Sequence, residues 1–409
     1  MVIAVTKPVV IVGASLGGLR TAEALRRFGY LGAIKVIGDE VHAPYNRPPL
    51  SKEVLQQDAI SHESVAFPQR AATADVGWEL GRRVVSANLG ENRVKTDDGE
   101  TFEYSHLIIA TGLRPKKQTY PNNLNAGRFV VRTLDDALAL REALQPGKKV
   151  VVLGAGFIGC ETAATARKLG CDVTIVAPGD LPLKRALGAM LAGELQHRQE
   201  NNGVRFRLNR NVKDLIGTSH VTGISLDDGT ELECDVFIEA IGSLPNTELL
   251  EGNDIDIHDG LLCDSKLHAL TLGGQPILNV WGVGDVVRFP NGIFDNIARR
   301  VEHWNIPSEC AKYVGAAVAF ELADASEVAE KENPLTKPFR PVPSFWSDQF
   351  DVHILAYGLP GLADQSTLVQ GELEGDCIFE YHRKKELVGV AGIGMRTEVQ
   401  RYRNIFEEK

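Results

Sequence analysis

The sequence predicts an α/β fold of two similar strand and helix units, followed by a small α+β domain. Two observations carry this prediction. An apolar strand, a glycine-rich turn and a helical pattern occur at residues 9–28 and again at 150–169. Each copy continues into a DG turn and a returning apolar strand, at 97–99 and 107–112 in the first copy and at 227–229 and 236–242 in the second. A chain of 409 residues is also too long for one hydrophobic core.

The helices and strands between these landmarks follow from periodicity. Apolar residues from Leu19 to Phe28 recur at three-residue spacing, which predicts a helix that Gly29 ends, and residues 34–37 form the next strand. In the second copy we expect a helix at 160–169 and a strand at 173–176. Residues 333–338 indicate a linker, and strand-like alternation after it, as in 344–346 and 387–390, predicts the small third domain.

Composition limits the possible functions. The formal net charge of -10 disfavours nucleic-acid binding, and no apolar run is long enough to span a membrane, so we expect a cytoplasmic protein. The six cysteines form no CxxC pair, which disfavours a zinc site, a disulfide framework or a redox dithiol. No metal site is expected, and the cysteines are interpreted as small residues of a reduced interior.

The glycine turns predict dinucleotide binding. A pyrophosphate needs backbone N–H groups at a helix N-terminus with no side chain in the way. The second turn has the complete pattern Gly154, Gly156 and Gly159, whereas Ser15 stands at the middle position between Gly13 and Gly18 in the first. An ordinary strand-to-helix turn is the alternative, but the duplication favours two bound dinucleotides.

Asp39 follows the second strand of the first unit, where a carboxylate can accept hydrogen bonds from ribose hydroxyls. Glu40 competes with it for this role, and a solvated loop acid is the alternative interpretation of both residues.

Four further segments give the chain a family resemblance, at residues 44–52, 281–286, 300–304 and 345–349. With them the whole chain resembles the FAD-dependent pyridine nucleotide-disulfide oxidoreductases, and within these the ferredoxin reductases, such as putidaredoxin reductase and the reductase components of aromatic-ring dioxygenases. The resemblance implies a glutathione reductase-like fold with two Rossmann-like domains. It places a discontinuous FAD-binding domain at 1–116 and 249–332, an NAD(H)-binding domain at 117–248 and a C-terminal partner or interface domain at 333–409.

The resemblance also implies roles for three charged residues. Asp285 would accept from the ribityl chain of the flavin, although an N-cap is the alternative. Lys52 would lie beside the isoalloxazine ring, where a cation favours the reduced anionic form; alone it would be a surface lysine. Glu161 would lie near the nicotinamide and could pair with Lys52, while stabilisation by the helix dipole is its simpler explanation. Lys52 and Glu161 are the candidate catalytic residues.

Further cofactor contacts are implied by the same resemblance. Arg132 suits the FAD diphosphate because its planar guanidinium binds bidentately. The remaining positions, each a packing or motif residue if the resemblance is set aside, are Gly17, Arg47, Val84, Thr111, Gly112 and Trp304.

The function that the resemblance implies is NADH-dependent ferredoxin reduction. Hydride would pass from NADH to FAD, and single electrons would then pass to a [2Fe–2S] ferredoxin or a rubredoxin that feeds a P450 or a Rieske oxygenase. No cysteine lies in residues 47–52, where peroxidases of this fold carry one. NADPH stays open as the coenzyme. In the resemblance, NADH users usually carry a glutamate at the end of the second strand of the NAD unit, where it accepts from the adenosine ribose hydroxyls, and Ala177 stands there in this chain. Asp180 could accept from the ribose instead, or Lys184 and Arg185 could bind the 2′-phosphate of NADPH.

A partner protein would need a docking surface near the flavin. Trp304 and Trp346 are candidates for it, with burial in the core as the alternative. Basic residues gather in the last domain and could meet an acidic ferredoxin or be simply solvated: Arg383, Lys384, Lys385, Arg396, Arg401 and Arg403. Two other functions compete, a flavin NADH oxidase or diaphorase without a protein acceptor, and an interaction protein like apoptosis-inducing factor. The oligomeric state, monomer or homodimer, is open.

Overall fold

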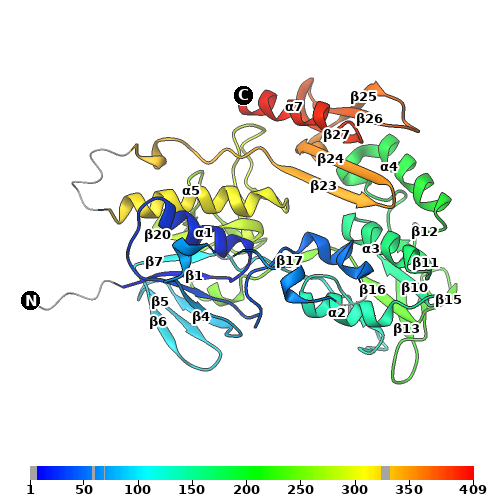
Figure 1. The fold of residues 1–409 in the computed structure, drawn as a ribbon, viewed down its shortest axis with the longest axis horizontal. Coiled ribbons are helices and arrows are strands. Elements are labelled where there is room, and N and C mark those ends of the chain that lie inside the picture. The colour runs from blue at the N-terminus through cyan, green and yellow to red at the C-terminus, as the bar shows by residue number, and fades with distance from the viewer. Residues whose placement is uncertain (1–6, 58–59, 69, 324–331) are drawn as a thin grey trace, which may run out of the picture. The chain divides into compact units, whose positions relative to one another are not determined.

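A computed structural model describes residues 7–57, 60–68, 70–323 and 332–409. These residues divide into two compact units (Figure 1). The first unit comprises the described residues up to 46, 65–114 and 244–343, and the second comprises those of 47–64, 115–243 and 344–409. The expected boundaries of three domains stay a prediction.

The first unit is built on a six-stranded sheet of order β19-β20-β7-β1-β2-β3. The central strand β1 pairs in parallel with both β2 and β7, and its four residues are all buried, as expected for a strand covered on both faces. The strands are β1 (Val9–Val12), β2 (Ile34–Ile37), β3 (Gly77–Glu79), β7 (His106–Ile109), β19 (His268–Leu270) and β20 (Pro276–Gly282). The strands predicted at the glycine turn and at 34–37 are confirmed, and the strand predicted at 107–112 is found at His106–Ile109.

Two helices of the first unit, α1 (Leu16–Arg27) and α5 (Asn305–Glu321), pack very closely. A Cβ on Gly315 would lie 2.4 Å from the Cβ of Ala24, so only glycine lets the helices approach this far. The DG turn at 97–99 joins two antiparallel strands, as predicted. The small sheets of this unit contain β4 (Val84–Asn88), β5 (Arg93–Thr96) and β6 (Thr101–Glu103), and β18 (Leu261–Leu262), β21 (Val287–Phe289) and β22 (Arg299–Arg300).

The second unit repeats the plan with a five-stranded parallel sheet of order β12-β11-β10-β16-β9. Its strands are β9 (Arg128–Phe129), β10 (Lys149–Leu153), β11 (Asp172–Ala177), β12 (Arg205–Leu208) and β16 (Val236–Glu239). Its helices are α2 (Leu134–Ala143), α3 (Phe157–Lys168) and α4 (Lys184–Asn201). Helix α3 begins before the predicted residue 160, because the glycine turn leads directly into its first turn.

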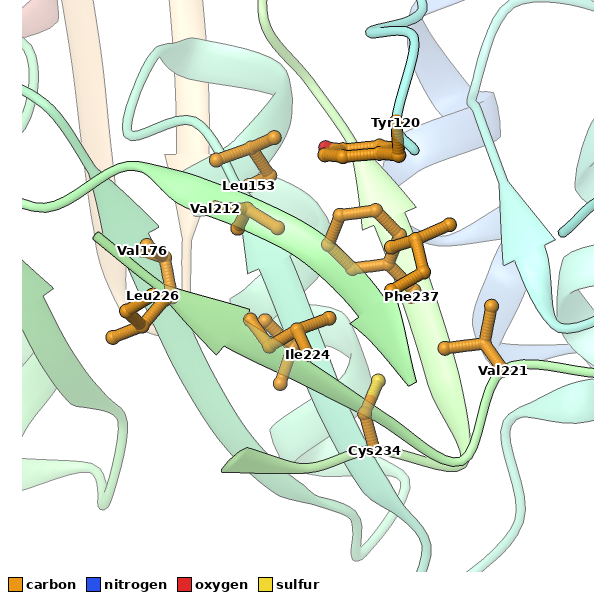
Figure 2. Packing of buried hydrophobic residues seen from close by; sticks show 11 residues of the cluster. Tyr120, Leu153, Val176, Val212, Val221, Ile224, Leu226, Cys234 and Phe237 are labelled. Carbon is orange, nitrogen blue, oxygen red and sulfur yellow. The ribbon is translucent and has the colours of Figure 1, made fainter. Parts of the chain in front are cut away.

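An antiparallel sheet packs on this parallel sheet through a layer of buried apolar side chains (Figure 2). The sheet consists of β13 (Val212–Ile216), β14 (Gly223–Leu226) and β15 (Glu231–Glu233), the last two joined by the predicted DG turn at 227–229. Phe237 of β16 lies at the centre of the layer, with the ring of Tyr120 at 6.1 Å and Ile224 facing it from β14.

The C-terminal segment forms a five-stranded antiparallel sheet and a helix, which confirms the predicted α+β character of this part. The sheet has the order β23-β24-β27-β26-β25. Its elements are β23 (Ser344–Gln349), β24 (Val352–Gly358), β25 (Gln365–Gly371), β26 (Cys377–Arg383), β27 (Glu386–Ile393) and α7 (Arg396–Glu407). Among the described residues, no helix has both the length and the apolar character that crossing a membrane requires.

Candidate functional site

The turn between β1 and α1 leaves no space for a side chain at its first and last glycines. Gly13 has a φ of +119°, and a Cβ there would lie 2.1 Å from the carbonyl oxygen of Ala110. A Cβ on Gly18 would lie 1.9 Å from the carbonyl oxygen of Gly13. Both positions therefore require glycine, and helix α1 starts directly beside the strand that precedes it.

The turn between β10 and α3 has the same geometry. Gly154 has a φ of +111°, and a Cβ there would lie 2.2 Å from the carbonyl oxygen of Ala240. A Cβ on Gly159 would lie 2.1 Å from the carbonyl oxygen of Gly154. The two units thus contain the same tight glycine turn, each at the carboxyl end of its central strand.

The middle position of the second turn faces open space. No atom lies within 4 Å of a Cβ built on Gly156, so a ligand can approach the backbone at the start of α3. Ser15 holds the equivalent position of the first turn, where it is half-buried and is the N-cap residue of α1 without a side-chain capping hydrogen bond. The second turn therefore presents helix N–H groups to an open cradle, an arrangement that fits a pyrophosphate.

The acids after β2 differ in their surroundings. Asp39 is exposed, whereas Glu40 is half-buried and accepts a hydrogen bond from the Tyr45 hydroxyl at 2.5 Å. The carboxylate of Glu40 is therefore already engaged within the unit. Asp39 stays the predicted ribose acceptor.

The remaining predicted residues of the first unit lie in or next to its strands. Thr111 and Gly112 follow β7, and the Thr111 hydroxyl donates to the carbonyl oxygen of Asn246 at 2.7 Å. Asp285 lies half-buried in the short helix η6 (Gly284–Val286), whose N-cap is Val283, so the N-cap interpretation of Asp285 is wrong. Val84 is buried at the start of β4.

Lys52 and Glu161 form a buried ion pair within the second unit. Lys52 follows the short helix η1 (Pro48–Ser51), and its Nζ lies 2.7 Å from Glu161 Oε2 of α3. The side chains are only 10% and 2% exposed, so the surface-lysine interpretation of Lys52 is wrong. Glu161 also lies beyond the first turn of α3, which contains no acidic residue, so the helix dipole explains little of its placement.

Lys52 also lines a cavity of about 260 Å³. The cavity wall combines the segment after η1 with α3 and with the turn that follows β23. Its lining residues include Lys52, Glu53, Thr165, Lys168, Phe350 and His353.

The two predicted arginines of the second unit contact each other. Arg47 Nη1 donates to the carbonyl oxygen of Arg132 at 2.7 Å. The backbone N–H of Arg132 donates to the carboxylate of Asp136, which also closes a capping box with Thr133 at the start of α2. The position of Arg132 is therefore fixed from both sides by backbone hydrogen bonds.

The end of β11, where a coenzyme ribose is expected, carries no carboxylate of its own. Ala177 is buried there, and Asp180 pairs with Lys184 at 2.5 Å on the exposed surface. The ammonium of Lys184 also lowers the pKa of Asp180. The two residues proposed for opposite coenzymes thus neutralise each other.

The cysteines are unsuited to redox chemistry. All six are free and buried. Burial raises the pKa of Cys160, Cys234 and Cys310 to about 12 and raises the pKa values of Cys171, Cys263 and Cys377 as well. Since the thiolate is the reactive form, the interpretation of these residues as interior packing is supported.

The candidate docking residues are partly exposed. Trp304 is 39% and Trp346 37% exposed, so the interpretation of both as core aromatics is wrong. Trp304 donates from Nε1 to Asn46 Oδ1 at 3.2 Å within the first unit. Of the basic residues near the C-terminus, Lys384, Lys385, Arg396, Arg401 and Arg403 are exposed and Arg383 is half-buried.

Sequence reasoning missed the other donors to Glu161. Ser51 Oγ and Ser347 Oγ each donate to its carboxylate at 2.7 Å. Both serines lie in segments that the sequence singled out, at 44–52 and 345–349, but nothing local indicated that these segments meet at one carboxylate.

Two glycine turns of dinucleotide-binding geometry and six buried thiols fit a protein that works through nucleotide cofactors rather than through a cysteine pair. The family model of the pyridine nucleotide-disulphide oxidoreductases matches residues 7–308, and that of the reductase C-terminal domain matches residues 344–409. The chain belongs to the pyridine nucleotide-disulphide oxidoreductase family, and it is an enzyme. Members of this family bind FAD and NAD(H), which confirms the two expected cofactors.

Individual relatives are similar over nearly the whole chain. The ferredoxin–NAD(+) reductase component of the anthranilate 1,2-dioxygenase system of Burkholderia cepacia is 34% identical over 368 residues, covering 89% of this chain and 85% of that protein. The ferredoxin reductase for the CYP199A2 system from Rhodopseudomonas palustris is 30% identical with a TM-score of 0.88, covering 99% and 95%. Putidaredoxin reductase in its covalent complex with putidaredoxin is 27% identical with a TM-score of 0.87, covering 98% and 93%. The predicted fold class is confirmed.

Proposed function

We propose that this enzyme is an NADH-dependent ferredoxin reductase that delivers electrons to a [2Fe–2S] ferredoxin or a rubredoxin. The observation that carries the proposal is the repeated glycine cradle, one for each of two dinucleotides, in a chain without a reactive thiol. The relatives named as ferredoxin reductases of dioxygenase and P450 systems support it. A P450 or a Rieske oxygenase would be the final consumer of the electrons.

Bound FAD would supply the step that the side chains cannot, the conversion of a hydride from NADH into two single electrons. The residues then bind and orient. In the first unit we assign FAD contacts to Gly13, Ser15, Gly17, Gly18, Asp39, Val84, Thr111, Gly112, Asp285 and Trp304. In the second unit we assign further FAD contacts to Arg47, Lys52 and Arg132, and coenzyme contacts to Gly154, Gly156, Gly159 and Glu161.

The proposed role of Lys52 rests on its charge and its confinement. Its ammonium donates to Glu161 and to the carbonyl oxygen of Pro48 at 3.1 Å, so the side chain is held at two points. A fixed cation stabilises a neighbouring group more strongly in the anionic than in the neutral state. We therefore assign Lys52 to favour the reduced cofactor, with Glu161 holding it in place.

We propose NADH rather than NADPH as the coenzyme. Lys184, a candidate for binding a 2′-phosphate, is paired with Asp180, which leaves less net positive charge at the end of β11. Measuring kcat/KM with both coenzymes tests this choice, and a strong preference for NADPH would overturn it.

The acceptor is tested by rapid mixing. Protein loaded with FAD is reduced by NADH in a stopped-flow instrument, and candidate [2Fe–2S] ferredoxins and rubredoxins are then added one at a time. We expect rapid reoxidation by one class of iron–sulfur protein and slow oxygen consumption without it. Equally fast oxygen consumption without any partner would identify a flavin oxidase instead, and a colourless protein that takes up no FAD would refute the proposal altogether.

A further inference from the structure

The carboxylate of Glu161 is unusually well supplied with donors for a side chain that is only 2% exposed. Lys52 Nζ and Ser51 Oγ both lie 2.7 Å from Oε2, and Ser347 Oγ lies 2.7 Å from Oε1. A buried charge is tolerated only when it is paired and hydrogen-bonded in this way. The third donor, Ser347, belongs to β23 in the C-terminal segment and is far along the sequence from Ser51 and Lys52.

A chain of hydrogen bonds stands behind Ser347. Gln349 Nε2 donates to Ser347 Oγ at 3.1 Å, and Gln199 Nε2 donates to Gln349 Oε1 at 2.7 Å. Gln199 Nε2 also donates to the carbonyl oxygen of Cys160 at 3.3 Å. Ser347, Gln349 and Gln199 are all buried, so the chain is shielded from water along its length.

The direction of this chain is fixed because both of its ends can only accept. The Cys160 carbonyl requires the amide nitrogen of Gln199, and this nitrogen in turn requires the amide oxygen of Gln349. The amide nitrogen of Gln349 is then left to donate to Ser347. A serine hydroxyl has one proton, so that of Ser347 is directed to Glu161.

Strand β23 is also aligned along helix α3 by packing. The ring of Phe345 lies 4.9 Å from that of Phe157 at the start of the helix, and Ser347 meets Glu161 about one helical turn further on. Since strand residues alternate between two faces, Phe345, Ser347 and Gln349 share the face toward α3. The serine is therefore held in position by contacts on both sides along the strand.

We propose that Ser347 and Gln349 are positioning residues that hold the carboxylate of Glu161 in place and thereby fix the ammonium of Lys52. The inference rests on the proposed function in one respect, the assignment of Lys52 to the flavin. The C-terminal strand would then be part of the redox machinery, and not only a surface for a partner.

Lys52 faces Glu161 across the ion pair, and Cys160 precedes Glu161 on α3. Burial raises the pKa of Cys160 to about 12, and the charge of Glu161 adds to this shift.

The experiment compares Ser347→Ala and Gln349→Glu with the unchanged full-length protein. Ser347→Ala removes the donor, and Gln349→Glu keeps the size and the contact with Gln199 but cannot donate to Ser347, whose proton is then diverted away from Glu161. Ser347→Thr restores the hydroxyl. Thr174→Val is the matched control. Thr174 carries a buried hydroxyl on β11 that accepts a hydrogen bond from Arg205 and forms none with Ser347, Gln349 or Gln199.

The readout is isotope-edited infrared spectroscopy of ¹³C-labelled glutamate, with the spectrum of the same variant carrying Glu161→Gln subtracted. We expect the carboxylate stretching band of Glu161 to shift in Ser347→Ala and in Gln349→Glu, since one hydrogen bond to the carboxylate is lost. Ser347→Thr and Thr174→Val should give the same band as the unchanged protein.

A second readout links the chain to catalysis. Flavin reduction by saturating NADH should slow about tenfold in Ser347→Ala, while KM for NADH changes less than about twofold. An unchanged infrared band in both Ser347→Ala and Gln349→Glu would overturn the proposal, whatever cofactor the protein uses. A shifted band in a protein that takes up no FAD would support the row of donors and refute the proposed function instead.

Discussion

The guanidinium of Arg128 and the carboxylate of Glu239 form an ion pair in the second unit whose side chains are 6% and 0% exposed. Arg128 Nε lies 2.5 Å from Glu239 Oε2, and the backbone N–H of Gln118 donates to Oε1 at 2.8 Å. Glu239 ends strand β16, opposite Leu153 of β10. In the first unit the equivalent position opposite Val12 is the apolar Ile109, so the pair belongs to the second unit alone.

Replacing Glu239 with leucine should destabilise the second unit by about 3–5 kcal/mol, because Arg128 would be left as a buried unpaired charge. Urea unfolding followed by circular dichroism measures the loss. The double variant Arg128→Met with Glu239→Leu should recover a large part of it, since no charge then stays buried. Equal destabilisation by the single and the double variant would contradict this explanation.

The two glycines of the second cradle should respond in opposite ways to alanine. Gly156→Ala places a methyl group in open space and should leave the melting temperature nearly unchanged while weakening coenzyme binding. Gly154→Ala places its Cβ 2.2 Å from the Ala240 carbonyl oxygen at a positive φ, and should lower the melting temperature markedly. Calorimetry and NADH titration separate the two effects. Intact NADH affinity in a stable Gly156→Ala protein would argue against the cradle.

Replacing Lys52 with methionine should slow flavin reduction by NADH by roughly ten- to a hundredfold. This range corresponds to the loss of one charge-assisted hydrogen bond, about 1.5–3 kcal/mol, from the transition state. Stopped-flow absorbance measures the rate. Lys148→Met is the control, because Lys148 forms an exposed ion pair with Asp235 and has no proposed role. The double variant with Glu161→Gln separates the loss of the cation from the stability cost of an unpaired carboxylate. A rate in Lys52→Met equal to that of the control would exclude the proposed role of the cation.

The buried thiols should make the protein less stable at alkaline pH. Cys160, Cys234 and Cys310 have pKa values of about 12 when folded, against 9.0 for an ordinary thiol. Above pH 9 the unfolded chain loses protons that the folded chain keeps, so the free energy of unfolding falls by roughly 1.4 kcal/mol per pH unit for each thiol. Urea unfolding between pH 8 and pH 10 measures the slope, which Cys234→Ala should reduce.

A thiol reagent gives an independent check of the same burial. Ellman's reagent at pH 8 should label none of the six cysteines rapidly in the native protein and all of them in urea. Rapid labelling of the native protein would show that a thiol is accessible and would reopen cysteine chemistry.

The elements that the sequence predicted correctly are those with local signals. The strands at 9–12 and 150–153, the DG turns and both helices after the glycines follow from residues a few positions apart. The start of α3 was misplaced, because Gly156 to Gly159 look like a loop in sequence although Phe157 already begins the helix. A glycine in the first helical turn is expected only once the nucleotide cradle is recognised.

The candidate site was predictable only in part, for a physical reason. The pairing of Lys52 with Glu161 was anticipated from the family resemblance, but the contribution of Ser347 was not, because a hydrogen bond between strand β23 and helix α3 leaves no periodic trace in either segment. The same holds for Arg128 and Glu239, where a charged residue occupies a position that strand periodicity would give to an apolar one. Contacts of this kind depend on tertiary packing, which sequence spacing does not encode.

The alternation along β23 gives this strand two different sides. Trp346 is partly exposed, whereas Ser347 and Gln349 of the same six-residue strand are buried. Inserting a single residue before Phe345 would exchange the two sides, sending the tryptophan inward and the serine to the surface. The outward positions of β23 can therefore be substituted freely, whereas a one-residue shift within the strand would remove the donor from the carboxylate of Glu161.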